Sequence, residues 1–159
     1  MRLAFAAVFV LALAACNQGG PPPASTSTSS ATTASAPSTA EMQAKVAALA
    51  APYNAASYEN GRSVFAQCRA CHTINAGGIN MVGPNLHGVI GRRIASVEGY
   101  NYSPALKAQS FTWDADHLEK WLEGPMTDIP GTRMSFPGVH NDNDRRDVIA
   151  FLTVESQQP

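Results

Sequence analysis

The chain is 159 residues long, enough for one domain of ordinary size with extensions. Its formal net charge of -1 at pH 7, with no run of lysine or arginine, argues against nucleic acid as a partner, because phosphate binding needs a basic patch. The three cysteines, Cys16, Cys68 and Cys71, are an odd number, so each needs its own explanation.

The N-terminus is typical of an exported lipoprotein. Arg2 precedes an apolar run over residues 3–15, which is too short to cross a bilayer of about 30 Å as a helix. The run ends at Cys16 in the sequence L-A-A-C, which is similar to a bacterial lipobox. We predict a lipoprotein signal peptide at residues 1–15 and lipidation of Cys16. The alternative is an ordinary secretory signal cleaved near Ala15.

A flexible linker is expected after the anchor. Residues 17 to about 40 are almost only small and polar, and such a composition cannot bury enough apolar surface to offset the ordering entropy. The weak helical pattern of Met42, Val46 and Leu49 indicates either a short helix or more linker. We assign residues 16–56 to a lipid-anchored flexible linker and residues 57–159 to the folded domain.

Helical periodicity divides the folded domain. Apolar residues recur at helical spacing over residues 58–71, 114–123 and 143–154, and a shorter helix is expected over residues 103–109, with Pro104 at its first position. Residues 73–102 have no sustained period.

A C-x-x-C-H motif occupies residues 68–72. Residues three apart lie on one face of a helical turn, so the thiols of Cys68 and Cys71 can reach the two vinyl groups of one haem, and His72 supplies the proximal nitrogen to the iron. A structural disulfide, a thioredoxin-like redox pair and half of a zinc site are the alternatives. The redox pair needs a preceding strand, and zinc needs a second Cys or His pair. We predict one covalent haem c, which would also fill the core beside the long loop.

The sixth ligand of the iron has several candidates: Met81, Met126, Met134, His87, His117 and His140. Met81 follows His72 closely and is expected on the proximal side, and His117 is expected at the polar edge of its helix. Met134 lies within residues 129–138, where prolines and glycines limit the freedom of the loop. A rigid loop can hold a weak thioether ligand, so we predict Met134.

Together these features resemble class I cytochromes c, the family of mitochondrial cytochrome c and its membrane-anchored bacterial counterparts. The resemblance covers residues 57 to about 155. It is carried by Gly61 with Phe65, by residues 68–73, 83–88, 91–92, 102–103 and 112–113, by residues 130–134 with Phe136 and Gly138, and by residues 147–152. It implies an all-α cytochrome c fold, with three to five helices wrapped around one covalently attached haem.

The resemblance also implies roles for individual residues. His72 and Met134 would be the axial ligands, and the Pro84 carbonyl would accept a hydrogen bond from the other ring nitrogen of His72. Gly61 would let the first helix cross closely against the last, near Phe151. Five residues match positions that bond or shield the haem propionates: Arg92, Tyr102, Ser103, Trp113 and Thr132. The alternatives are a core aromatic for Trp113 and a solvated arginine pair, 92–93, for Arg92.

Some positions depart from the family pattern. Trp121 stands where a tyrosine often lies beside the ligating methionine, and Leu106 replaces an asparagine, which should dry the pocket. Met126 and Thr127 stand where the mitochondrial proteins place lysines around the exposed haem edge. We therefore expect electron transfer of the tethered protein to depend only weakly on salt.

The resemblance implies a one-electron carrier and not an enzyme, because two protein ligands leave the iron no open position. It implies a cytochrome bc complex as donor and a haem–copper terminal oxidase or a photosynthetic reaction centre as acceptor. We expect a monomer, lipid-anchored on the periplasmic side of the bacterial cell envelope. A haem enzyme or gas binder, with Met134 off the iron, and a fixed subunit of a dehydrogenase or oxidase are the alternatives.

Overall fold

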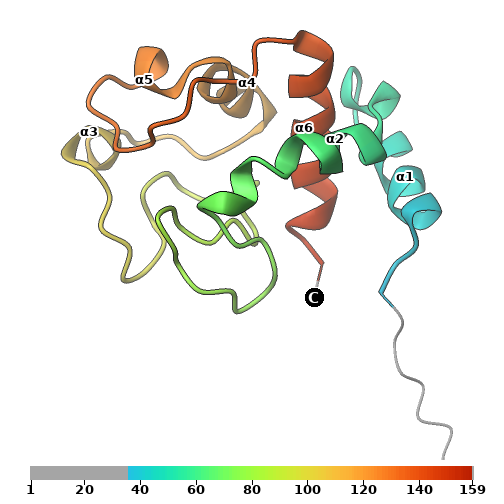
Figure 1. Cartoon of the computed structure of the whole chain (residues 1–159), viewed down its shortest axis with the longest axis horizontal. Coiled ribbons are helices and arrows are strands. Elements are labelled where there is room, and N and C mark those ends of the chain that lie inside the picture. The colour runs from blue at the N-terminus through green and yellow to red at the C-terminus, as the bar shows by residue number, and fades with distance from the viewer. Residues whose placement is uncertain (1–35, 159) are drawn as a thin grey trace, which may run out of the picture. The chain divides into compact units, whose positions relative to one another are not determined.

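The computed structural model describes residues 36–158 (Figure 1). Its helices are α1 (Thr39–Ala47), α2 (Tyr58–Phe65), α3 (Pro104–Lys107), α4 (Ala115–Glu123), α5 (Pro125–Asp128) and α6 (Asp142–Glu155), with short 3₁₀ turns η1 (Tyr53–Ala55) and η2 (Cys68–Ala70). Within residues 36–158 the β-type pairing is limited to one bridge, Arg93 with Thr112. The all-α prediction is confirmed. The predicted signal peptide and Cys16 lie outside the described residues.

Local capping signals set the helix starts. The Asp114 side chain accepts from the backbone N–H of His117 at the start of α4, and Asn141 caps α6 through the N–H groups of Asn143 and Asp144. Such caps satisfy backbone donors that have no partner within the helix. These two helices therefore begin where the sequence predicts. The predicted helix over residues 58–71 is instead divided, because η2 replaces its last turn with the tighter 3₁₀ winding.

Helices α2 and α6 cross in close contact, and Gly61 permits it. A Cβ at this position would overlap the backbone carbonyl oxygen of Asp147 and lie 2.7 Å from the Cβ of Phe151. The Phe151 ring lies 5.1 Å from that of Phe65 and 5.3 Å from that of Tyr58, centroid to centroid. The close crossing of the first and last helices of the haem domain, which the resemblance implies, is thus present. Aromatic side chains fill the space between α2 and α6.

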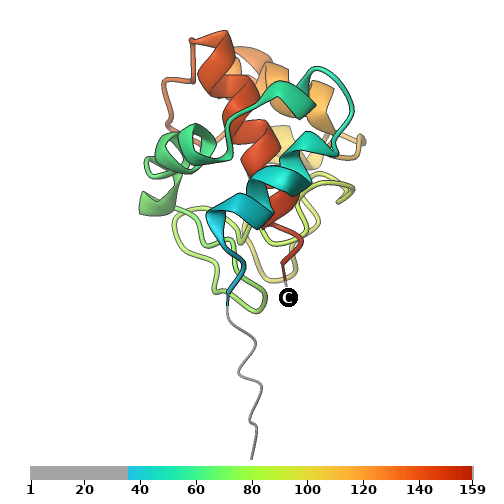
Figure 2. The same ribbon diagram turned by 90° about the vertical axis from the view of Figure 1, so that its right-hand side faces the viewer.

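Helix α1 packs against this crossing, beside α6 (Figures 1 and 2). Met42 and Val46 are 2% and 0% exposed, and the Gln43 side chain donates to the Ala56 carbonyl and accepts from the Tyr58 N–H. The prediction that the flexible linker extends to residue 56 is therefore wrong for residues 39–56. The segment is ordered because its two buried apolar side chains pack against α2 and α6 and the Gln43 amide bridges its two ends.

Backbone hydrogen bonds organise the long loop of residues 73–102. The Leu86 N–H donates to the Thr73 carbonyl at 2.8 Å, and the Gly91 N–H donates to the Trp113 carbonyl at 2.8 Å. Gly91 has φ +82°, which favours glycine. The loop, as predicted, has no helix. Among residues 36–158, no helix is long and apolar enough to cross a membrane.

Candidate functional site

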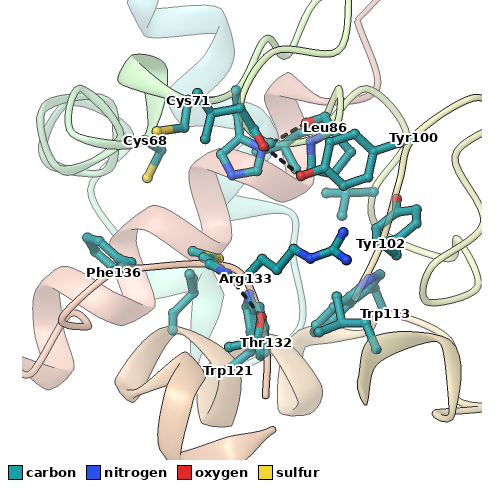
Figure 3. A pocket seen from close by; sticks show the side chains of 18 of the residues that line it. Cys68, Cys71, Leu86, Tyr100, Tyr102, Trp113, Trp121, Thr132, Arg133 and Phe136 are labelled. Atoms are coloured by element: carbon teal, nitrogen blue, oxygen red, sulfur yellow. Dashed lines mark hydrogen bonds between the residues drawn. The ribbon is translucent and has the colours of Figure 1, made fainter. Parts of the chain in front are cut away.

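One cavity, of about 340 Å³, lies between the long loop, α4 and the segment that follows α5 (Figure 3). All of the predicted haem-contacting residues line it: Cys68, Cys71, His72, Pro84, Arg92, Tyr102, Ser103, Trp113, Thr132 and Met134. They come from segments far apart in the chain. The fold therefore brings together the residues that the sequence singles out.

The C-x-x-C-H motif forms one wall of the cavity. Cys68 and Cys71 are free thiols that lie side by side in Figure 3. Burial, with a smaller effect of the neighbouring Cys71, raises the pKa of Cys68 to about 11. Within residues 36–158 there is no strand before the motif and no cluster of residues able to hold a metal by protein ligands alone. Neither the thioredoxin-like nor the zinc alternative gains support.

The His72 ring is fixed in position and in tautomer. Its Nδ1 lies 2.7 Å from the Pro84 carbonyl oxygen, so Nδ1–H donates and Nε2 keeps a free lone pair. Burial lowers the pKa of His72, which favours the neutral imidazole that can bind a metal. A Cβ at Gly83 would overlap the His72 ring, so only glycine lets the loop pass behind it.

Met134 belongs to a loop with little freedom. The Thr132 hydroxyl accepts from the Met134 N–H at 3.2 Å, and the Thr132 N–H donates to the Ile129 carbonyl at 3.1 Å. Gly131 has φ +88°, and beyond Met134 a Cβ at Gly138 would overlap the Glu123 carbonyl oxygen. Met134 packs partly buried against the core. The loop thus holds the thioether at the cavity, as the proline and glycine pattern predicts.

The other candidates for the sixth ligand do not line this cavity: Met81, Met126, His87, His117 and His140. His117 stacks on Phe111 at 4.1 Å between ring centroids and pairs with Asp114 at 2.7 Å. Met81 and Met126 are 44% and 56% exposed. Met134 is therefore the one methionine of residues 36–158 at the cavity.

Two guanidinium groups line the cavity, and no lysine or carboxylate of residues 36–158 joins them. Arg92 donates to the carbonyls of His87 and Asn85 at 2.8 and 3.0 Å, so it is not simply a solvated partner of its neighbour. Arg133 extends toward Tyr102 in Figure 3 and donates to the Asn101 carbonyl at 2.9 Å. Such a cavity favours an anionic group.

Arg133 also lies at the cavity, although the sequence predicts no role for it. The one sequence feature that could have pointed to Arg133 is its place next to Met134, within a stretch that carries the resemblance. Its approach to the cavity depends on the Asn101 carbonyl, 32 residues away in the chain, and no local pattern indicates that contact.

Aromatic and aliphatic side chains form the remaining walls. Trp113 and Trp121 are 8% and 6% exposed, with ring centroids 5.6 Å apart, and Leu106 lies on the same cavity. Tyr102 packs edge-on against Tyr100 at 4.7 Å. Of the residues that depart from the family pattern, Trp121 and Leu106 line the cavity and make its wall apolar.

The residues present fit a haem c. The group is a large apolar ring with two carboxylates, two vinyl carbons that thiols can attack, and an iron that takes nitrogen and thioether ligands. The cavity offers apolar walls, two guanidiniums, two thiols three residues apart, one neutral imidazole and one thioether.

Comparisons with known proteins agree with this fit. Residues 58–154 match the family model described as Cytochrome c. A cytochrome c homolog of Bradyrhizobium diazoefficiens is 46% identical over 105 residues, which is 65% of this chain but only 57% of that protein. Cytochrome c2 of Rhodomicrobium vannielii is 42% identical over 109 residues, covering 69% of this chain and 87% of its own length.

A solved structure is similar as well. Cytochrome cH from Methylobacterium extorquens superposes with a TM-score of 0.56 at 40% sequence identity, over 60% of this chain and 96% of its own.

Proposed function

The chain belongs to the cytochrome c family, whose members carry one covalently attached c-type haem and transfer electrons, and we propose that His72 and Met134 are the axial ligands of that haem. The observation that carries the proposal is that both side chains, with the thiols of Cys68 and Cys71, line one cavity. The two cysteines would hold the haem through thioether bonds.

The ligand pair makes the protein a carrier and not an enzyme. The bound haem supplies a reversible one-electron couple between ferric and ferrous iron. His72 is held by the Pro84 carbonyl and Met134 by the loop around Thr132, so the two side chains would keep both protein-ligand positions of the iron occupied. Oxygen and peroxide then find no open site, and little rearrangement accompanies electron transfer.

The polar side chains at the cavity would hold the haem propionates. Arg92 and Arg133 supply the positive charge. The hydroxyls of Ser103 and Thr132 each accept from a backbone N–H, which leaves their own protons free to donate. The rings of Tyr102 and Trp113 complete this set of proposed cofactor contacts. The apolar wall around Leu106 and Trp121 would disfavour the more highly charged ferric state of the haem and so would raise its reduction potential.

The cellular setting follows from the sequence and from the family. Bacterial relatives with this haem domain support a periplasmic location. We propose that residues 1–15 are a signal peptide, that lipidation at Cys16 anchors the chain to a membrane, and that the linker ends where α1 begins, at Thr39. A monomer would accept electrons from a cytochrome bc complex and deliver them to a haem–copper oxidase or a photosynthetic reaction centre.

The test of the ligand pair is spectroscopic. The full chain, matured with haem, should show the weak far-red absorption band of iron–methionine ligation in its oxidised form. Met134→Ala should abolish the band and let the reduced protein bind carbon monoxide. Met126→Ala is the matched control, because this methionine is 56% exposed and away from the cavity.

Two outcomes would contradict the assignment. One is a far-red band that survives in Met134→Ala. The other is ready binding of carbon monoxide by the unmodified reduced protein, which would indicate an open distal site and a haem enzyme or gas sensor.

A further inference from the structure

Large apolar side chains are exposed at one place beside the cavity. Of the four such residues within 36–158, three lie in a single short segment: Ile79, Met81 and Val82, which are 73%, 44% and 76% exposed. Isolated exposed apolar residues are ordinary on a protein surface, but a cluster of them marks an interaction site. We name residues 79–82 the apolar segment. It leads directly into Gly83, and Val82 itself lines the cavity.

The backbone of the apolar segment is held in place from both ends. The Thr73 hydroxyl donates to the Ile79 carbonyl at 2.7 Å, and the Tyr100 hydroxyl donates to the Val82 carbonyl at 2.6 Å. The side chains therefore point to solvent from a fixed backbone. A surface that is already ordered loses little conformational entropy when a partner covers it.

Charge is absent from the apolar segment, and in the haem-loaded protein the two propionates would balance the two arginines of the neighbouring cavity. Asn80 is its one polar residue, and it contacts Glu98 only through that residue's backbone carbonyl. Arg92 and Arg133 donate to backbone carbonyls. A charged partner surface placed over the segment would lose hydration without gaining an ion pair from residues 79–82 themselves.

We propose that the apolar segment is the docking surface for an uncharged, apolar face of a protein redox partner. The proposal rests on the proposed function, since it requires the haem in the cavity that Val82 borders. Contact at this segment brings the partner to the mouth of the cavity and expels water from the approach. A bilayer is the less suitable occupant, because surface-binding segments combine apolar side chains with Lys or Arg, and this segment has neither.

Electrodes of defined surface chemistry can stand in for the partner. The full haem-loaded chain is studied by voltammetry on gold coated with methyl-terminated or carboxylate-terminated alkanethiols of equal length. We expect faster electron exchange on the methyl surface. Val82→Lys should slow that exchange by about tenfold, because a charge must be desolvated on contact. Val82→Thr, which keeps the shape and adds no charge, should slow it less.

Ala47→Lys is the matched control, because it adds the same charge on an exposed position of α1, which contributes nothing to the cavity. We expect it to leave the rate on the methyl surface unchanged. Equal slowing by Val82→Lys and Ala47→Lys, or faster exchange of the unmodified protein on carboxylate, would overturn the docking proposal while a reversible wave still supports the carrier. No reversible wave on any surface would overturn the carrier and the docking proposal together.

A second measurement separates a protein partner from the bilayer. The variant Met81→Cys is alkylated with a water-soluble maleimide in detergent and in phosphatidylcholine vesicles. Similar rates in the two media support a segment that faces the aqueous phase. Strong protection in the vesicles would show that the membrane covers the segment, and the protein-partner proposal would then be wrong.

Discussion

The helical region, built from α1, α2 and α6, and the loop region, residues 73–102 with 129–141, are stabilised in different ways. In the helical region side chains fill the interior, as in the contact of Phe65 with Phe151. In the loop region the chain is joined by backbone hydrogen bonds and surrounds a cavity of about 340 Å³. The comparison teaches that the first region carries its own core, whereas the second needs a bound group to complete one.

The largest effect is expected when the haem is removed. Cys68→Ala combined with Cys71→Ala should abolish covalent attachment of the haem. Backbone amides of the loop region should then exchange with solvent about a thousandfold faster or more, equal to about 4 kcal/mol of lost stabilisation, while amides of α2 and α6 lose less. Hydrogen exchange read by mass spectrometry checks this, with Arg69→Ala as the control inside the same motif. An equal loss of protection in both regions would show that the loop region depends on the haem no more than the helical region does.

The next test acts on the helical region. Gly61→Val should lower the free energy of unfolding by about 3 kcal/mol, because the new side chain meets backbone of α6 that cannot move aside cheaply. Denaturant unfolding of the haem-loaded chain measures it. Ser63→Val introduces the same side chain at an exposed position of α2 and should cost far less. Similar losses in the two variants would mean that close packing does not set the stability of the crossing.

A smaller loss is expected for α1. Met42→Ala should lower the free energy of unfolding by about 2 kcal/mol, since it deletes a side chain that is 2% exposed. The absorption spectrum of the haem should stay unchanged, because α1 contributes no residue to the cavity. Lys45→Ala, on the exposed side of α1, is the control. If Met42→Ala were as stable as the unmodified chain, residues 39–47 would not be part of the folded domain and would belong to the linker.

The smallest effect concerns pH. Burial, followed by a hydrogen bond of 2.9 Å from its hydroxyl to Glu155, raises the pKa of Tyr58 to about 12. An unfolded tyrosine has a pKa of about 10, so this group stabilises the fold below pH 10, and its contribution is lost as the pH rises through 12. Tyr58→Phe should cost about 1 kcal/mol at pH 8 through the lost hydrogen bond.

The two proteins should converge in stability by pH 11, and parallel unfolding curves at pH 8 and pH 11 measure this. A gap that stays constant between the two pH values would show that Tyr58 is not protected from ionisation in the folded state.

Local patterns in the sequence predicted the helices of the domain well. The starts of α4 and α6 follow directly after their caps, Asp114 and Asn141, because a capping side chain needs only neighbours two or three residues away. The assignment of α1 to the linker is wrong because its apolar pattern is weak and its burial depends on α6, about a hundred residues later. The four-residue α5 and the division of the helix before Cys71 were missed for a similar reason: turns this short carry no period.

The residues that line the cavity could be predicted from the sequence, but the hydrogen bonds that hold them in place could not. A single motif identifies Cys68, Cys71 and His72, and the family pattern points to Met134. The contact of Arg133 with Asn101 joins residues far apart in the chain, and only the folded structure reveals it. The hydrogen bond from Tyr100 to Val82 is another of this kind.

The bonds that hold the apolar segment use main-chain atoms, namely the carbonyl oxygens of Ile79 and Val82. Any amino acid other than proline supplies the same main chain, so substitutions at residues 79, 81 and 82 leave the framework of the loop intact. Mutation can therefore change the chemistry of this surface while the hydrogen bonds that hold its backbone remain. With the docking surface we propose, a carrier of this kind could acquire a new partner over evolutionary time through changes at residues 79, 81 and 82 alone, while the residues around its haem stay the same.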